Sequence, residues 1–103
     1  MSTLHAVSES FIDLRGLQQY EERLAEAKAR CDVSGRSFAE FVQSGLMRTL
    51  GESAAKSTVI QLGTDTMSSP SVLVERLVLL FHRAAVIVLR ELVAYWEGWS
   101  DGM

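Results

Sequence analysis

The sequence predicts an all-α protein of four to five helices, organised as a homodimeric helical bundle around a long, buried C-terminal helix. Three observations lead to this prediction. Apolar residues recur at intervals of three and four along much of the chain, as they do on helices and not on strands. The 103 residues include one proline and seven glycines and are 48% hydrophobic, so a single globular domain over 1–103 is expected. The third observation is a C-terminal stretch that is apolar around most of its circumference.

This stretch, Ser71 to Glu97, is predicted to form one continuous helix. Its polar residues come in pairs spaced seven and eight apart, which is helical recurrence. The pairs are Glu75/Arg76, His82/Arg83 and Arg90/Glu91. Ser68 and Ser69 offer an N-cap hydroxyl before Pro70, and Gly98 is expected to end the helix. A helix of this length would span about 40 Å.

A membrane span is the main rival to a buried helix for this stretch. The six ionisable side chains of the three pairs recur at regular depth. Each would cost roughly 2.5 to 3.5 kcal/mol at a bilayer centre. A soluble, buried helix is therefore the preferred interpretation.

The apolar surface of this predicted helix is wider than the rest of one chain can cover, because the other helices offer one narrow apolar face each. An identical helix across a two-fold axis would cover it, so an obligate homodimer built on residues 72–95 is expected. An antiparallel crossing would bring Glu75 of one copy towards Arg90 of the other. The expected interface residues are Leu79, His82, Val86, Leu89, Arg90 and Val93.

The N-terminal third of the chain contains one ambiguous segment and one clear helix. In residues 1–16 apolar residues recur as on a helix, yet residues 10–15 could also form a short strand ended by Gly16; helix is preferred. From Leu17 to Cys31 the apolar spacing alternates between three and four, which predicts an amphipathic helix. Residues 32–36 are then expected to form a turn.

Two further helices are predicted in the middle of the chain. Ser37 and Glu40 have the spacing of a capping box, so a helix is expected to start here and to continue to Leu50, with Gly45 allowing close approach of another helix. Gly51 ends or kinks it. A shorter helix is expected over 52–62 with Gly63 as its C-cap, and residues 64–69 are expected to form a loop.

For the candidate reactive residues, a structural role is preferred to metal binding or catalysis. His82 lies seven and nine residues from Glu75 and Glu91, not the three or four that lets helical side chains share a metal ion. Cys31 closes a helix seam and is interpreted as a packed thiol rather than a reactive one. No phosphate-binding loop, paired-cysteine motif or nucleophile elbow is present. No enzyme activity, cofactor or metal is therefore expected.

Trp96 and Trp99 have two interpretations. They could form an exposed tip that recognises a partner, or an aromatic end packed on the bundle; the second is preferred. The net charge of −3 gives no electrostatic footprint for nucleic acid or an anionic membrane. The single cysteine and the absence of a signal-peptide pattern at the N-terminus favour a cytoplasmic location.

One part of the chain resembles a known family of DNA-binding proteins. Ser10 to Arg15 as a strand, Leu17 to Cys31 as a helix, residues 33–38 as a serine-containing turn and residues 40–50 as a second helix are similar to ribbon-helix-helix repressors. That resemblance implies a dimer whose paired strands lie in the DNA major groove. Residues 1–50 carry seven acidic and six basic side chains, which disfavours DNA binding because phosphate neutralisation supplies most non-specific affinity.

A second resemblance covers residues 46–93. The segments Leu46 to Ser53, Leu62-Gly63, Pro70 and Leu77 to Leu89 are similar to small all-helical output domains of archaeal signalling proteins, although His82 and Arg83 stand where a glycine is expected after the phenylalanine. This resemblance implies a helical fold without catalytic motifs. The function expected from the whole sequence is a non-enzymatic regulatory or protein-interaction module that acts as a homodimer on an unidentified protein partner. The alternative is a ribbon-helix-helix transcriptional regulator.

Overall fold

The computed structural model describes the backbone of residues 2–100 and the side chains of residues 17–99. Over this range the chain forms five α-helices and two short 3-10 helices and contains no strand, which confirms the all-α prediction and the number of helices. The elements are α1 (Ser2–Ser34), α2 (Phe38–Leu50), α3 (Glu52–Leu62), η1 (Thr64–Met67), α4 (Pro70–Phe81), η2 (His82–Ala84) and α5 (Ala85–Ser100).

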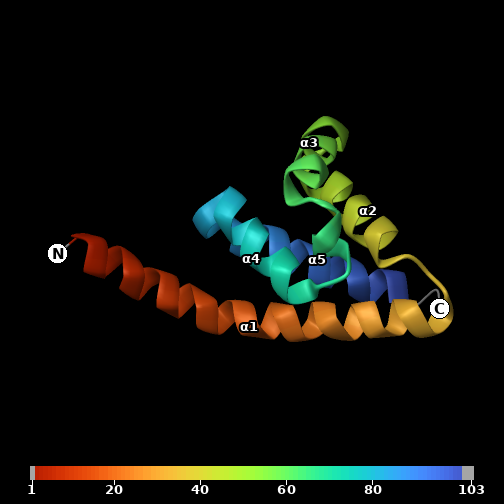
Figure 1. The fold of residues 1–103 in the computed structure, drawn as a ribbon, viewed down its shortest axis with the longest axis horizontal. Helices are drawn as coiled ribbons and strands as arrows, with labels where there is room; N and C mark the ends of the chain where they lie inside the picture. The colour runs from red at the N-terminus through yellow and green to blue at the C-terminus, as the bar shows by residue number, and fades with distance from the viewer. Residues whose placement is uncertain (1, 101–103) are drawn as a thin grey trace.

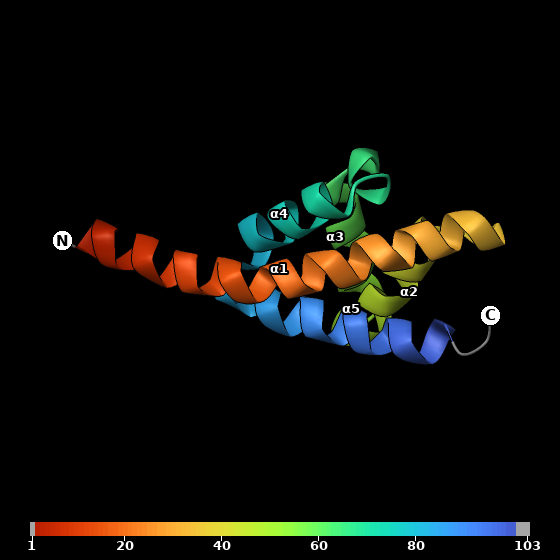
Figure 2. The ribbon, with the colours of Figure 1, turned by 90° about the horizontal axis from the view of Figure 1, so that it is seen from below.

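The helices pack around α1, the longest of them. α4 and α5 form a hairpin against α1, α2 packs on α5, and α3 lies on the side of α2 away from α1 (Figure 1). The short helix η1 connects α3 to the start of α4 and contacts α4. In the view from below, α1 runs along the seam between α4 and α5, and its N-terminal end extends past the other helices (Figure 2). Residues 10–15, which would be the strand of a ribbon-helix-helix module, lie inside α1, as the preferred helical interpretation expected.

The prediction of one long C-terminal helix is wrong for the single chain that the structure describes. The chain turns at His82, and α4 and α5 lie side by side instead of end to end. Folding back lets both halves bury apolar residues against α1 within one chain, which a straight helix of about 40 Å would not allow. The buried residues are Leu73, Val74 and Leu77 on α4 and Ala85, Val88, Leu89, Leu92 and Trp96 on α5.

Several predicted helix ends are confirmed. The Ser37 side chain accepts a hydrogen bond from the Glu40 backbone N–H at 3.1 Å, which caps α2. Ser69 caps α4 in the same way, ahead of Pro70 at the first helical position. Gly63, at φ 85°, ends α3.

Three other predicted boundaries need correction. Gly98 does not end the last helix, because α5 continues to Ser100. α1 continues to Ser34, so the turn predicted over residues 32–36 is shorter; its centre is Gly35 at φ 76°, where the Arg36 N–H donates to the Cys31 carbonyl at 2.9 Å. The predicted loop over 64–69 contains the 3-10 turn η1.

An ion pair fastens η1 to α4. The Arg76 guanidinium donates to both carboxylate oxygens of Asp65, at 2.7 and 2.8 Å, and also to the Leu62 carbonyl at the end of α3. This is the geometry of a fork-shaped donor on a planar acceptor. The partner of Arg76 therefore comes from outside its own helix.

Close contact between α2 and α5 depends on a glycine. A Cβ atom placed at Gly45 would lie 2.5 Å from Leu92 Cδ2 and 3.3 Å from Tyr95 Cδ2. Only a residue without a side chain lets the two helices approach to this distance. The close approach predicted at Gly45 is therefore confirmed, with α5 as the neighbouring helix.

Candidate functional site

Exposed apolar side chains gather near the turn between α4 and α5. Leu79 is 67% exposed and Ile87 is 56% exposed, although both are large hydrophobic residues. The other apolar side chains beside the turn are half-buried. We refer to Val78, Leu79, Leu80, Phe81, Val86 and Ile87 together as the corner residues. Exposed apolar groups gathered in one region mark interaction surfaces more often than isolated ones do.

One side of this corner opens into a groove of about 340 Å³ between α1 and α4. Val74, Val78 and Leu79 supply its apolar wall, and the carboxylates of Glu21 and Glu75 lie at its edges. The groove therefore suits an apolar side chain that is flanked by basic groups.

The structure places the six residues expected in the dimer interface in three environments. Leu79, His82 and Arg90 are exposed. Val86 and Val93 are half-buried. Leu89 is fully buried within the chain's own core. In this conformation five of the six side chains can contact a partner, and Leu89 cannot.

The aromatic residues of α5 converge on Phe41 of α2. The ring of Trp96 meets Phe41 edge-on with centroids 5.4 Å apart, and the ring of Trp99 lies 5.5 Å from Phe41. Trp96 is buried, and the guanidinium of Arg36 covers Trp99 at 3.9 Å from its ring centre. The preferred interpretation of these two residues, an aromatic end packed on the bundle, is what the structure shows.

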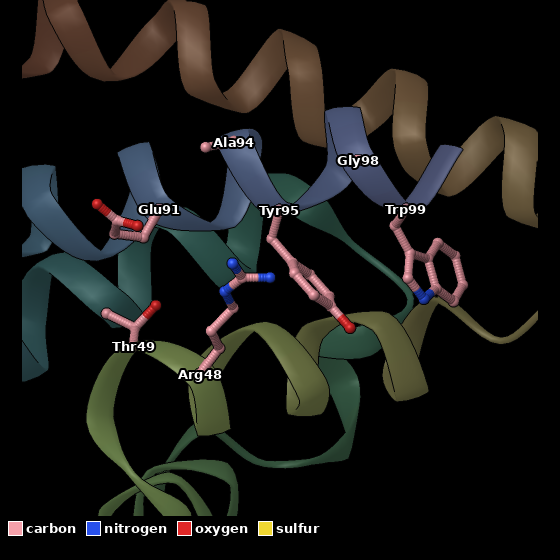
Figure 3. Close-up of a pocket in the computed structure, with 7 residues that line it drawn as sticks. All are labelled: Arg48, Thr49, Glu91, Ala94, Tyr95, Gly98 and Trp99. Carbon is pink, nitrogen blue, oxygen red and sulfur yellow. The ribbon is translucent and has the colours of Figure 1, made fainter. Parts of the chain in front are cut away.

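A second pocket, of about 420 Å³, lies beside this cluster between α2 and α5 (Figure 3). Its walls carry a cation, a carboxylate, a hydroxyl and an aromatic face. The lining residues are Arg48, Thr49, Glu91, Ala94, Tyr95, Gly98 and Trp99. In Figure 3 the Arg48 side chain reaches from α2 towards α5, between Glu91 and Tyr95.

Two of the polar groups of this pocket have defined neighbours. Arg48 lies 5.8 Å from the Tyr95 ring centre, and the Thr49 hydroxyl donates to the Gly45 carbonyl at 2.9 Å, which leaves its oxygen free to accept. A polar group of a partner could therefore meet both charges and the aromatic face. The sequence did not reveal this pocket, because its two walls are about 45 residues apart in the chain; the one signal was Gly45, which indicated close contact with another helix.

Cys31 is fully buried in the seam of α1. Burial raises the pKa of its thiol, and the negative charge of Asp32 acts in the same direction, while Arg36 and Lys28 oppose the shift. A thiol with a raised pKa is protonated at neutral pH, which makes it a poor nucleophile.

Three or more His, Cys, Asp or Glu side chains do not come together as a metal site within the part of the chain that the structure describes. In the same part of the chain, no helix combines the length and the apolar content needed to cross a bilayer. Comparison with protein-family models, with curated proteins and with solved structures found no match to this chain.

Proposed function

We propose that the protein is a non-enzymatic regulatory or protein-interaction module that acts as a homodimer through the corner residues. The observation that carries this proposal is the exposure of Leu79 and Ile87 beside one turn. Fully burying side chains of this size is worth roughly 1.5 to 3 kcal/mol each. A complex in which a partner covers both side chains is therefore stabilised by apolar burial that the single chain lacks.

Charge supports a second copy of the same chain as that partner. The groove beside Leu79 is edged by the carboxylates of Glu21 and Glu75. On α5 the exposed Arg90 lies one turn of helix beyond Ile87. A two-fold axis near the corner would let the acidic groove edge of each copy meet Arg90 of the other, and the symmetry would make this contact twice.

The regulatory part of the proposal rests on the sequence. The chain lacks the motifs that activate a nucleophile or bind a phosphate. Its resemblance over residues 46–93 is to output domains of signalling proteins. Such a homodimer would regulate another protein by binding to it.

Light scattering after gel filtration, over a range of protein concentrations, tests the homodimer. The wild-type protein is expected at twice 11.4 kDa, and Leu79→Glu and Ile87→Glu are expected to shift it towards the monomer. Ile60→Glu is the matched control, because Ile60 is 80% exposed on α3, away from the corner. It should leave the dimer unchanged. A wild-type monomer at all concentrations, or equal loss of dimer in all three variants, would disprove the proposal.

A further inference from the structure

The turn that separates α4 from α5 is held in an unfavourable backbone conformation. His82 has φ 53° and ψ −123°, and it is the one residue other than glycine with positive φ among those described. These angles lie outside the small left-handed region that side chains tolerate and belong to glycine. Such a conformation is unfavourable and persists only where the surrounding structure enforces it.

The sequence on both sides of this turn favours a different conformation. The helical spacing of polar pairs continues through residues 71–97 without interruption, and no proline or glycine lies between Pro70 and Gly98. His82, Arg83 and Ala84 are all exposed, so the turn itself buries little. Local preference and the observed turn therefore disagree at one residue, His82.

Besides α4, both α1 and α2 hold α5 in place. Its buried side chains face α1 and α2: Leu92 lies over Gly45, and Trp96 meets the ring of Phe41. A second copy of the chain carries the same surface of α1 and α2. An α5 helix supplied by that copy would make the same contacts.

We propose that the homodimer forms by exchange of α5. In each copy His82 adopts helical angles, α4 and α5 join into one helix over residues 70–100, and α5 packs on α1 and α2 of the other copy. Every core contact of α5 with those helices is kept, and the strain at both His82 residues is released. Short hinges under strain favour this kind of exchange.

This geometry accounts for the interface residues expected from the sequence. Leu79, His82 and Val86 lie within one turn of helix of the joint, where the two continuous helices would cross. Leu89 is buried within one chain in the closed form, in which α5 folds back on its own chain. After exchange, Leu89 would contact the other copy instead. The inference rests on the proposed homodimer and specifies how that dimer is built.

Two substitutions at the joint test the exchange. His82→Gly relaxes the closed turn and disfavours a continuous helix, so it should weaken the dimer. Release of the strain at two joints corresponds to about a hundredfold increase in dissociation constant, at about tenfold per joint. His82→Ala keeps the strain and favours helix, so its dimer should be at least as tight as the wild type.

Ala84→Gly is the matched control for the effect of glycine on helix formation. Ala84 lies in the same exposed turn but does not have positive φ, so glycine relieves no strain there. It should weaken the dimer much less than His82→Gly. Equal weakening by the two glycine substitutions would overturn the role of His82 strain.

Mixed isotope labelling distinguishes exchange from a dimer of closed chains. Labelled and unlabelled protein are unfolded together, refolded as mixed dimers and studied by isotope-filtered NMR. Exchange predicts contacts between the Phe41 ring of one copy and the Trp96 ring of the other, whose centroids are 5.4 Å apart. A dimer whose Phe41 to Trp96 contacts stay within one chain would overturn exchange and leave the proposed homodimer intact. A protein that is monomeric throughout would overturn both.

Discussion

Gly45 on α2 and Gly98 on α5 predict different effects of the same substitution. Gly45 and Gly98 both lie within helices, and neither has positive φ. Alanine is better than glycine in a helix by about 0.8 to 1.0 kcal/mol, so the backbone term favours both substitutions, less so at Gly98 near the helix end. A Cβ at Gly98 meets nothing within 4 Å. Gly98→Ala should therefore stabilise the protein by up to about 1 kcal/mol.

At Gly45 the new methyl group has no space. It would lie 2.5 Å from Leu92 Cδ2, and Leu92 is fully buried, so the contact is relieved only by moving α5 or forcing Leu92 off its rotamer. Overpacking of this kind costs typically 1 to 3 kcal/mol. Together with the gain in helix propensity, Gly45→Ala should leave the protein between unchanged and about 2 kcal/mol less stable.

Thermal unfolding followed by circular dichroism measures both variants, at one protein concentration because a dimer's melting temperature depends on it. For a domain of this size, 1 kcal/mol corresponds to about 4 to 8 °C. Gly98→Ala should melt above the wild type, and Gly45→Ala at or below it. A melting temperature for Gly45→Ala that rises as much as that of Gly98→Ala would show that α2 and α5 are not in close contact at this point.

Two further predictions concern Arg76 and Cys31. Arg76→Lys should destabilise the protein nearly as much as Arg76→Ala in urea unfolding, because a lysine ammonium cannot bind both oxygens of Asp65 and the Leu62 carbonyl with the same fork; full retention of stability by the lysine variant would contradict this. The Cys31 thiol should react with a thiol reagent only after denaturation, and rapid labelling of the native protein at neutral pH would contradict its burial. Because the folded state raises the pKa of this thiol, its contribution to stability is present below the ordinary thiol pKa and is lost as the pH rises through the folded pKa, so the unfolding free energy relative to Cys31→Ala should fall at alkaline pH.

Local signals allowed most helix ends to be predicted from the sequence. Capping is a short-range interaction, so Ser37, Ser69 and Gly63 were identifiable from neighbouring residues alone. The amphipathic helix over 17–31 was equally clear, and its apolar residues Leu17, Leu24, Ala27 and Cys31 are buried in the structure. Its extension by three residues, from Cys31 to Ser34, depends on where Gly35 begins the turn.

The turn at His82 could not be predicted, because its cause is not local. Nothing in the sequence around residues 81–84 indicates a turn, and histidine does not favour φ 53° with ψ −123°. The turn is imposed by burial of α4 and α5 against α1, which depends on residues far away in the chain. The pocket between α2 and α5 was missed for the same reason. Its charged walls come from two helices whose packing the sequence indicated only through Gly45.

The convergence of both tryptophans on Phe41 determines what intrinsic fluorescence can report. Since Trp96 and Trp99 lie 5.9 Å apart and touch the same ring, their emission reports one event, the docking of α5 on α2. No other tryptophan is present, so α3 and the N-terminal half of α1 are spectroscopically silent. An α5 helix from the same chain and one from a second copy would surround both indoles alike. Emission spectra of a closed monomer and an exchanged dimer should therefore coincide, even while the two differ twofold in mass.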